Sequence, residues 1–215
     1  MAVKRPVYLD ANVLIPSITR GLLIIGAVTS DYAVKWSRFG EEEAERHQHQ
    51  GASKISELRS RFGWDVLVAN VAPVGMVDTD VKDQRHLSAA HAAGARLIIT
   101  DNIKDFGLED LSRLSMSAVT PDLFLSIRLD SSSYTTVLDS LARGRTRDPK
   151  TPTDIHRIEV ARMLPSVANA FAATYGVTLE EPVKGDMTHT FRGVRCVRCE
   201  QVMDASTTPL CPSCS

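Results

Sequence analysis

The stretch Pro6-Val-Tyr-Leu-Asp10-Ala-Asn12 decides the fold that this sequence predicts. Val7, Tyr8 and Leu9 favour a strand, and Asp10 comes where the apolar run meets a turn. An apolar run closed by polar residues is typical of a strand in a parallel sheet that helices cover on both faces. Because open α/β sheets carry their functional crevice at the carboxyl ends of the strands, Asp10 is a candidate for a metal-binding or catalytic carboxylate.

The rest of the chain alternates in the same way between strand-like and helix-like segments. Further strands are predicted at Asp31–Trp36, Trp64–Val71 and Arg96–Thr100, with an edge strand at Ser117–Thr120. Helices are predicted at Ser17–Val28, Arg38–His49 after a Ser37 cap, Ser53–Phe62, Leu87–Ala93 before a Gly94 C-cap, Leu108–Leu114, Pro121–Leu129, Tyr134–Leu141 and Asp154–Met163 after a Thr153 cap, with a last piece that ends at Gly176. The predicted fold class is therefore α/β, a parallel sheet flanked by helices, followed by a helical extension.

Composition narrows the class of protein. The 215 residues are 43% hydrophobic, which is ordinary for a globular chain, and the net charge of −1 argues against a wholly basic nucleic-acid coat. The longest apolar run, Leu22–Val28, is too short to span a bilayer, and no secretion signal follows Met1–Arg5. All four cysteines fall in the last 20 residues, unlike those of a secreted disulfide scaffold, so we expect the reducing cytoplasm.

Acidic residues gather at the ends of three predicted strands or turns. They are the Asp10/Asn12 pair, the turn Asp78–Asp83 and the segment Asp101–Asp105. Parallel connectivity would bring these segments to one edge of the sheet. Carboxylates in one place raise one another's pKa, and a hard divalent cation such as Mg²⁺ or Mn²⁺ removes that repulsion. Two such ions about 3.5–4 Å apart can activate water and stabilise the leaving oxygen in phosphodiester hydrolysis.

Four motifs in order now suggest a family. The sequence resembles a PIN-domain endoribonuclease of the kind found as VapC-type toxins, over roughly residues 5–130. The matching pieces are Val7–Leu14, the spacing from Trp36-Ser37 to Glu43, Lys82–Ala90 with Gly94-Ala95, and Ile98–Phe106. The chain departs from the family pattern at Gly40, where an apolar helix residue is common.

This resemblance implies a site. Its acidic ligands of Mg²⁺ or Mn²⁺ would be Asp10, Glu43, Asp83 and Asp105, with Asn102 as a polar ligand or water-positioning residue and with Thr100 and Asn12 shaping the site. From the residues alone, Glu42 competes with Glu43, because a shift of helix register exchanges them. His86 and His91 are interpreted as packed or solvated helix residues.

The tail carries a separate metal-binding pattern. Cys196 and Cys199 form one C-x₂-C pair and Cys211 and Cys214 a second, eleven residues further on. Four thiolates arranged as two such turns make a closed tetrahedral zinc site, here one that resembles a zinc ribbon. Iron with the same ligands is the less favoured alternative. Because so short a tail buries little apolar surface, metal binding would supply its folding free energy.

Clustered basic residues are the candidate RNA contacts, since arginine and lysine bind phosphates without regard to sequence. The candidates are Arg143, Arg145, Arg147 and Lys150 in the basic loop, and Arg195 and Arg198 near the first cysteine pair. A flexible hinge is an equal interpretation of the loop, and solvated surface charge is the alternative for the tail arginines. The domains we expect are a PIN-like nuclease domain at 1–142, the basic loop, helical extension and linker at 143–183, and the zinc ribbon at 184–215.

The function implied is metal-dependent endoribonuclease activity, with RNA as the substrate and a toxin–antitoxin pair as the setting. The resemblance also implies a cognate antitoxin that covers the acidic cleft, and a homodimer. Three alternatives stay open: a PIN nuclease of RNA maturation, a non-catalytic adaptor that binds RNA or protein, and, ranked low, a haloacid-dehalogenase-like phosphatase, which would want a second aspartate at Asn12.

Overall fold

Seven strands form one mixed sheet. The computed structural model describes residues 4–49, 52, 54–62, 65–73, 75–146, 148–177, 190–206 and 208–215. The strands are β1 (Arg5–Leu9), β2 (Tyr32–Ser37), β3 (Leu67–Val68), β4 (Leu97–Ile99), β5 (Ser117–Val119), β6 (Phe191–Arg195) and β7 (Val202–Ser206). Their order is β3-β2-β1-β4-β5-β6-β7, and the first five are parallel whereas β6 and β7 are antiparallel. The predicted α/β class is confirmed, but the sheet is mixed because the C-terminal strands join it.

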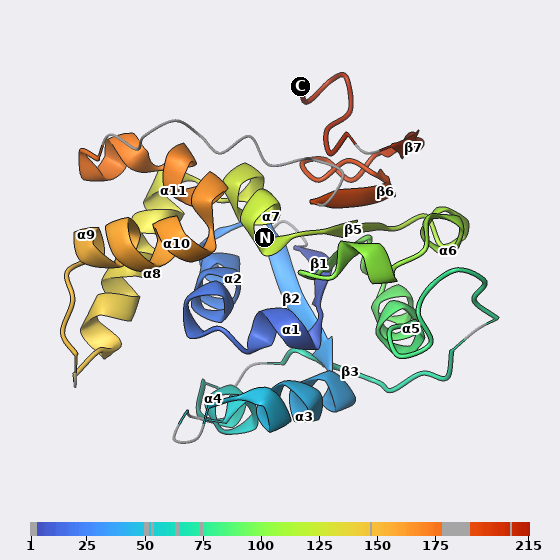
Figure 1. The fold of residues 1–215 in the computed structure, drawn as a ribbon, viewed down its shortest axis with the longest axis horizontal. Coiled ribbons are helices and arrows are strands. Elements are labelled where there is room, and N and C mark those ends of the chain that lie inside the picture. The colour runs from blue at the N-terminus through green and yellow to red at the C-terminus, as the bar shows by residue number, and fades with distance from the viewer. Residues whose placement is uncertain are drawn as a thin grey trace.

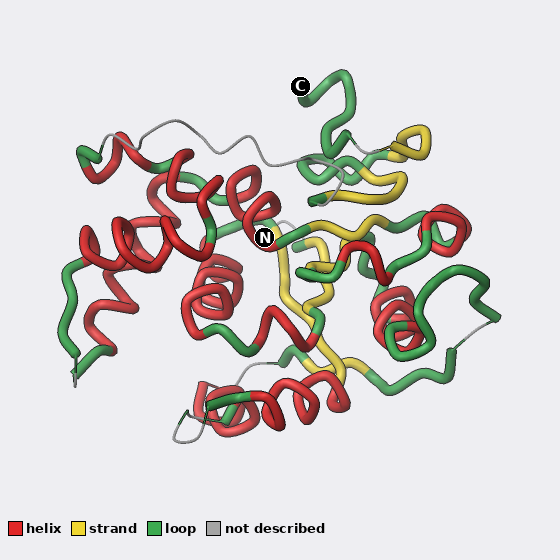
Figure 2. The backbone as a smooth tube through the Cα atoms, viewed as in Figure 1, coloured by secondary structure: helices red, strands yellow, loops and turns green. Residues whose placement is uncertain are grey.

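The helices lie on both sides of this sheet (Figures 1 and 2). They are α1 (Ala11–Leu14), α2 (Ser17–Thr29), α3 (Arg38–His47), α4 (Ile55–Phe62), α5 (Gln84–Ala92), η1 (Ile103–Asp105), α6 (Leu108–Arg113), α7 (Pro121–Arg128), α8 (Ser131–Gly144), α9 (Pro152–Asp154), the π-helix η2 (Ile155–Val160), α10 (Ala161–Met163), α11 (Pro165–Ala170) and η3 (Ala172–Tyr175). Figure 1 places α2, α7 and the later helices on one face and α5 and α6 on the other. Among the described residues, none of these helices combines the length and apolar character that crossing a bilayer requires.

The strands divide their side chains between two hydrophobic clusters, as the two-residue period of a strand dictates. On β1, Val7 and Leu9 belong to the larger cluster and Tyr8 to the smaller one. On β4, Ile98 likewise faces the smaller cluster, away from its two neighbours. The C-terminal helices share the larger cluster, to which η2 contributes Val160. Both faces of the central strands are therefore buried, which is why they read as continuous apolar runs.

Helix caps explain several of the boundaries. The Ser37 hydroxyl accepts a hydrogen bond from the Gly40 amide at 3.2 Å, which confirms the predicted start of α3. Gly94 has a φ of +72°, the left-handed conformation expected just after α5. The predicted Thr153 cap is wrong: Thr151 caps α9, and Asp154 completes a capping box with it. The two threonines are equivalent by type, and only Thr151 has an acid three residues later.

Two predicted strands differ from the structure. Only Leu67–Val68 of the predicted run Trp64–Val71 forms a strand in the part of the chain that the structure describes. Ser117–Thr120 was expected at an edge, but β5 pairs with β4 on one side and β6 on the other. Gly193 allows the β5–β6 approach, because a Cβ there would lie 2.5 Å from the Ser117 Cα. The predicted linker at Val177–Thr188 lies almost wholly outside the described residues.

Candidate functional site

Asp10 lies at the point where the order of the parallel strands reverses. β1 lies between β2 and β4 in the sheet. From β1 the chain builds the sheet toward one edge through β2 and β3, and it then returns to place β4 and β5 on the other side of β1. Ligands of open α/β sheets bind at such a switch point, outside the carboxyl ends of the strands. The Asp10 amide donates to the Ile99 carbonyl at 3.0 Å, and the Asp10 side chain is 3% exposed. The residue is thus fixed at the predicted place.

Neighbouring polar groups orient the Asp10 carboxylate. Its Oδ2 accepts hydrogen bonds from the Thr100 hydroxyl at 2.7 Å and the Asn12 amide at 2.8 Å. Its Oδ1 accepts from the Ala11 amide at 2.7 Å, and so Asp10 also caps α1. Asn12 and Thr100 therefore hold the Asp10 carboxylate in one orientation. The exposed Asn102 follows directly, with its backbone amide donating to the Thr100 hydroxyl at 3.0 Å.

His86 lies between two of the predicted acids. Its Nδ1 is 3.4 Å from Asp10 Oδ1, and its Nε2 is 3.3 Å from Glu43 Oε2. The ring is 2% exposed, with the Tyr8 hydroxyl 3.3 Å from Nδ1 and Phe39 packed edge to face against it at 4.6 Å. Sequence reasoning missed this residue as part of the site. The only signal was its place three residues after Asp83, one helical turn further along α5.

The three glutamates at the start of α3 face in different directions. Glu41 is buried and binds Arg59 through both carboxylate oxygens, at 2.8 and 3.1 Å. Glu42 is exposed, whereas Glu43 contacts His86, whose hydrogen bond lowers the pKa of the Glu43 carboxyl. Of the competing pair, Glu43 is therefore the one that contacts His86, whose other ring nitrogen lies against Asp10.

Gly40, the departure from the family pattern, has a local reason. A Cβ at this position would lie 3.3 Å from both the Cε1 of His86 and the Oγ of Ser37. A larger apolar residue would press against the His86 ring. The glycine and the histidine therefore fit each other in this chain.

Asp83 and Asp105 complete the acidic group. Burial raises the pKa of the Asp83 carboxyl to about 6, and the negative charge of Asp10 adds to this effect. Asp105 and Asp80 act in the same direction, while His86 opposes them. Asp83 occupies the N-cap position of α5 but makes no capping hydrogen bond, so its carboxylate is left for the site. Asp10 and Asp105, from two other segments of the chain, thus act electrostatically on Asp83.

The turn that carries Asp83 is fastened by a buried carboxylate on α6. Asp110 accepts hydrogen bonds from the amides of Val77, Asp78 and Thr79, at 2.9 to 3.1 Å. Burial would raise the pKa of Asp110, but these amides outweigh it and lower the pKa to about 2. In return, Asp78 accepts from the amides of Glu109 and Asp110. The reciprocal capping fixes the turn against α6.

The second candidate site is the group of four cysteines, Cys196, Cys199, Cys211 and Cys214. Their sulfur atoms all lie within 4.8 Å of one another, and Cys199 and Cys211 are 3.6 Å apart. Zinc–sulfur bonds of about 2.3 Å in a tetrahedron put the sulfurs about 3.8 Å apart, so the geometry fits a metal ion such as zinc. Burial acts to raise the pKa of Cys196, but the amides of Cys199 and Cys211 pointed at its sulfur lower it to about 6. No other described residues form such a compact ligand group.

Ion pairs join this cysteine segment to the sheet. The buried Arg128 binds the Asp31 carboxylate at 2.7 Å, the Glu200 carboxylate at 3.2 Å and the Val197 carbonyl at 3.0 Å. Glu200 has a φ of +61°, an unusual conformation for a residue with a side chain, and its carboxylate also lies 3.9 Å from the Arg5 guanidinium. The cysteine turn is thus held against the start of β1 and the end of α7.

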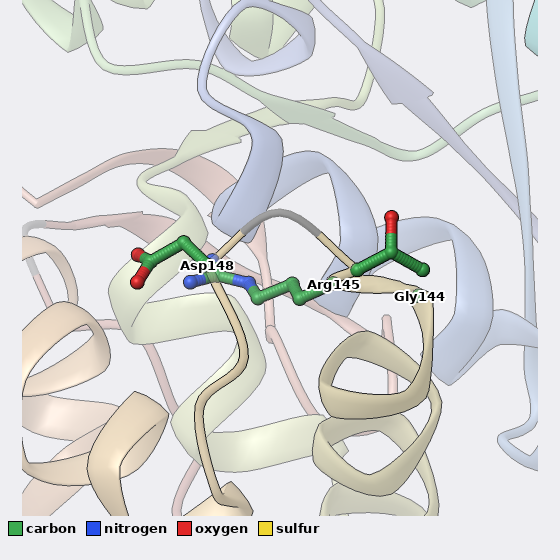
Figure 3. A pocket seen from close by; sticks show the side chains of 4 residues that line it. Gly144, Arg145 and Asp148 are labelled. Carbon is green, nitrogen blue, oxygen red and sulfur yellow. The ribbon is translucent and has the colours of Figure 1, made fainter.

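The basic residues predicted to contact RNA differ in whether their charged groups are already paired with acidic side chains. Arg145 and Lys150 both bind Glu159, and Lys150 also lies 3.2 Å from Asp148. Arg145 helps to line a pocket of about 330 Å³ and extends across the loop toward Asp148 (Figure 3). Arg143 is exposed, and its hydrogen bond to Ser140 is within its own helix. Arg147 lies outside the described residues.

The two arginines near the first cysteine pair also differ in how far their guanidinium groups are engaged in hydrogen bonds. The Arg195 guanidinium donates to the carbonyls of Ser115 and Glu200 at 2.8 and 2.9 Å, which gives it a structural role. Arg198 is exposed and reaches the Cys214 carbonyl at 3.4 Å.

Comparison with known proteins adds no relative: no family model, no curated protein and no solved structure matches this chain. Function must therefore be argued from the residues themselves.

Proposed function

We propose that the protein is a metal-dependent endoribonuclease of the PIN-domain type, which hydrolyses RNA phosphodiester bonds. The observation that supports the proposal most is that the negative charges of Asp10 and Asp105, which come from other segments of the chain, act on the half-buried Asp83. Burial is the main cause of the raised pKa of Asp83, and the charges of Asp10, Asp105 and Asp80 add to it while His86 opposes them. Groups of this kind are favourable when a divalent cation is bound.

The acids would hold Mg²⁺ or Mn²⁺, whose carboxylate-oxygen preference fits Asp10, Glu43, Asp83 and Asp105. When bound, such an ion lowers the pKa of a coordinated water and stabilises charge on the phosphate. Thr100 and Asn12 keep Asp10 in one orientation, and His86 keeps Glu43 close to it. Asn102, exposed beside Thr100, would position water or substrate.

RNA would reach the site along exposed cations that flank it. Lys82 and Arg85 lie on either side of Asp83, Lys104 precedes Asp105, and all three are exposed. Arg85 also packs over the Phe39 ring at 5.2 Å, an arrangement of cation and aromatic ring suited to phosphate and base contacts. These three are better placed for the substrate than Arg145 and Lys150, whose charges Glu159 already balances.

The setting we propose is the cytoplasm, with the protein as the toxin of a type II toxin–antitoxin pair. A cognate antitoxin would cover the acidic cleft, and the nuclease would act as a homodimer. The four-cysteine segment would be a zinc ribbon that helps to hold the fold or the substrate. These points rest on the resemblance of the four sequence motifs, not on the acids alone.

A non-catalytic adaptor that binds RNA or protein is the second candidate. It is favoured by one observation: the ligand atoms of the acids do not gather within 4.8 Å as those of the cysteines do. In an adaptor the cysteine segment would carry the interaction, and the acidic group would only shape a surface.

RNA cleavage with Mn²⁺ separates the two candidates. We expect the wild-type chain to cut single-stranded RNA, and D83N and E43Q to lower the rate on the order of a hundredfold. E42Q is the matched control, since Glu42 is exposed on the same helix and should leave the rate unchanged. A wild-type chain that binds zinc and RNA but cuts nothing, with Mn²⁺ or Mg²⁺, supports the adaptor and ends the nuclease proposal.

A further inference from the structure

The strand that leads into the cysteines also reaches the acidic site. β6 pairs with β5 in a register that places Arg192 opposite Ala118. The Ser117 hydroxyl locks this register, accepting from the Arg195 amide at 2.7 Å. From this position the Arg192 guanidinium donates to the Phe106 carbonyl at 3.2 Å and the Lys104 carbonyl at 3.4 Å. These two carbonyls belong to the residues on either side of Asp105.

The backbone around Asp105 is held from two directions. Arg192 binds the carbonyls before and after it, while the Asp105 carbonyl itself accepts from the Asp80 amide at 2.8 Å. Three successive carbonyl groups are therefore fixed, two by the cysteine segment and one by the turn that carries Asp83. The 3₁₀ turn η1 has only three residues, so these outside contacts decide where the Asp105 carboxylate lies.

The position of Arg192 depends in turn on the cysteines. Arg192 directly precedes the bulge of the strand at Gly193–Arg195, and Cys196 follows Arg195 directly. At its start β6 is held by its pairing with β5 and by the buried Phe191, whereas at its end it leads into the cysteine turn, which a bound metal would stabilise. Loss of metal from the four thiols would loosen β6 and with it the guanidinium that holds the Asp105 loop.

We propose that Arg192 is a positioning residue that couples metal occupancy of the four-cysteine site to the geometry of the acidic site. The inference rests on the proposed function for the role of Asp105 as a ligand. Arg192 touches neither site directly, and it acts through the backbone carbonyls of Lys104 and Phe106. The cysteine segment is then a support for the acidic site, built from the far end of the chain.

Amide hydrogen exchange of residues 103–107 in the full-length, zinc-loaded chain tests this coupling. In R192M we expect exchange of this segment to become about tenfold faster, since two hydrogen bonds from a charged donor are lost. Zinc content should stay that of the wild type. R192K should fall between the two, because one ammonium group can reach one carbonyl. R198M is the matched control, an exposed arginine in the same segment that makes no bond to the 103–107 loop.

Two further readouts separate this proposal from the nuclease proposal. Removing metal from the four cysteines should speed exchange at 103–107 in the wild type but add little in R192M. Mn²⁺ binding, followed by its electron paramagnetic resonance, should weaken in R192M and not in R198M. Exchange at 103–107 that is equal in wild type and R192M, or that rises as much in R198M, overturns the proposal. Because exchange needs no RNA, a wild-type chain without nuclease activity ends the proposed function but still decides the coupling.

Discussion

The two candidate metal sites hold their ligands in opposite ways. The four cysteine sulfurs lie within 4.8 Å of one another, whereas the acids come together only loosely, with His86 between Asp10 and Glu43. An ordinary thiol is neutral at pH 7, so four of them can be packed with far less repulsion than four carboxylates, and a bound metal favours their deprotonated form. Carboxylates at neutral pH repel, and the fold keeps them apart or buffers them with a histidine.

The comparison shows how far the contacts of the surrounding protein hold each site in place. The acidic site depends on a rigid frame of hydrogen bonds: Thr100 on Asp10, Asp110 on the turn before Asp83, and Arg192 on the loop of Asp105. The cysteine site is joined to the sheet by Arg128 and Arg195, but the closeness of its four sulfurs is what a bound ion would stabilise. Removing zinc should therefore unfold the cysteine site, whereas removing Mg²⁺ or Mn²⁺ should leave the acidic site folded.

The largest effect should come from the cysteines. C199S removes one of four thiolate ligands, and we expect loss of zinc and a fall of roughly 5 kcal/mol or more in the free energy of unfolding of the cysteine segment. Elemental analysis and chemical unfolding measure both. D10N is the matched comparison, because it should keep its zinc. A C199S chain that unfolds like the wild type would mean that the segment does not depend on metal.

The frame of the acidic site can be broken at Asp110. D110A leaves the amides of Val77, Asp78 and Thr79 without their buried acceptor, which should cost about 3 kcal/mol of stability. Urea unfolding at neutral pH measures the loss, and zinc content should not change. D204N, at an exposed position on β7, serves as control. A loss below about 1 kcal/mol would show that water replaces the carboxylate and that the frame is soft.

The charge of the acidic site should appear as a pH dependence at Asp83. Its pKa of about 6 in the folded chain exceeds the 3.8 of an ordinary aspartate, so the folded state holds the proton more tightly. Without divalent cation, the Asp83 contribution to stability is therefore greatest below about pH 4 and is lost as the pH rises through 6. The difference in unfolding free energy between wild type and D83N should follow this course. A difference that is constant from pH 4 to pH 7 contradicts a shared acidic pocket.

The smallest effect concerns Glu200, at the end of the first cysteine turn. Its φ of +61° costs a residue with a Cβ about 1 kcal/mol relative to glycine. Both E200G and E200A lose the ion pair with Arg128, so we expect E200G to be about 1 kcal/mol more stable than E200A. Thermal unfolding of the two variants side by side measures the difference. Equal stability would mean that the turn relaxes when the ion pair is gone.

The sequence predicts well those features that depend on residues close together in the chain. The apolar runs around Tyr8 and Ile98 predict buried strands, and Ser37 predicts the start of α3, because alternation and capping act over a few residues. The four cysteines predict their own proximity, since each pair sits in one turn. Asp10 at a strand end is placed correctly for the same reason.

What the sequence could not predict depends on contacts between distant segments. The sequence predicts β5 at an edge because no residue pattern near Ser117 indicates its pairing with Gly193, which lies more than seventy residues later. His86 was interpreted as packing, and it is packed, but between two acids that come from other elements. Arg195 was assigned to RNA by its charge, although backbone carbonyls take up its donors. Charge and residue type alone do not tell a free cation from an engaged one.

The pairing of β5 with β6 also bears on how the chain is made. Val119 leaves the ribosome about seventy residues before its partner Phe191, a delay of several seconds at usual rates of synthesis. During that time the edge of β5 that pairs with β6 has no partner strand, and the Asp105 loop lacks its hydrogen bonds from Arg192. This edge of β5 is consequently open to wrong pairing for that time, and the Asp105 loop takes its final form only when translation is almost over.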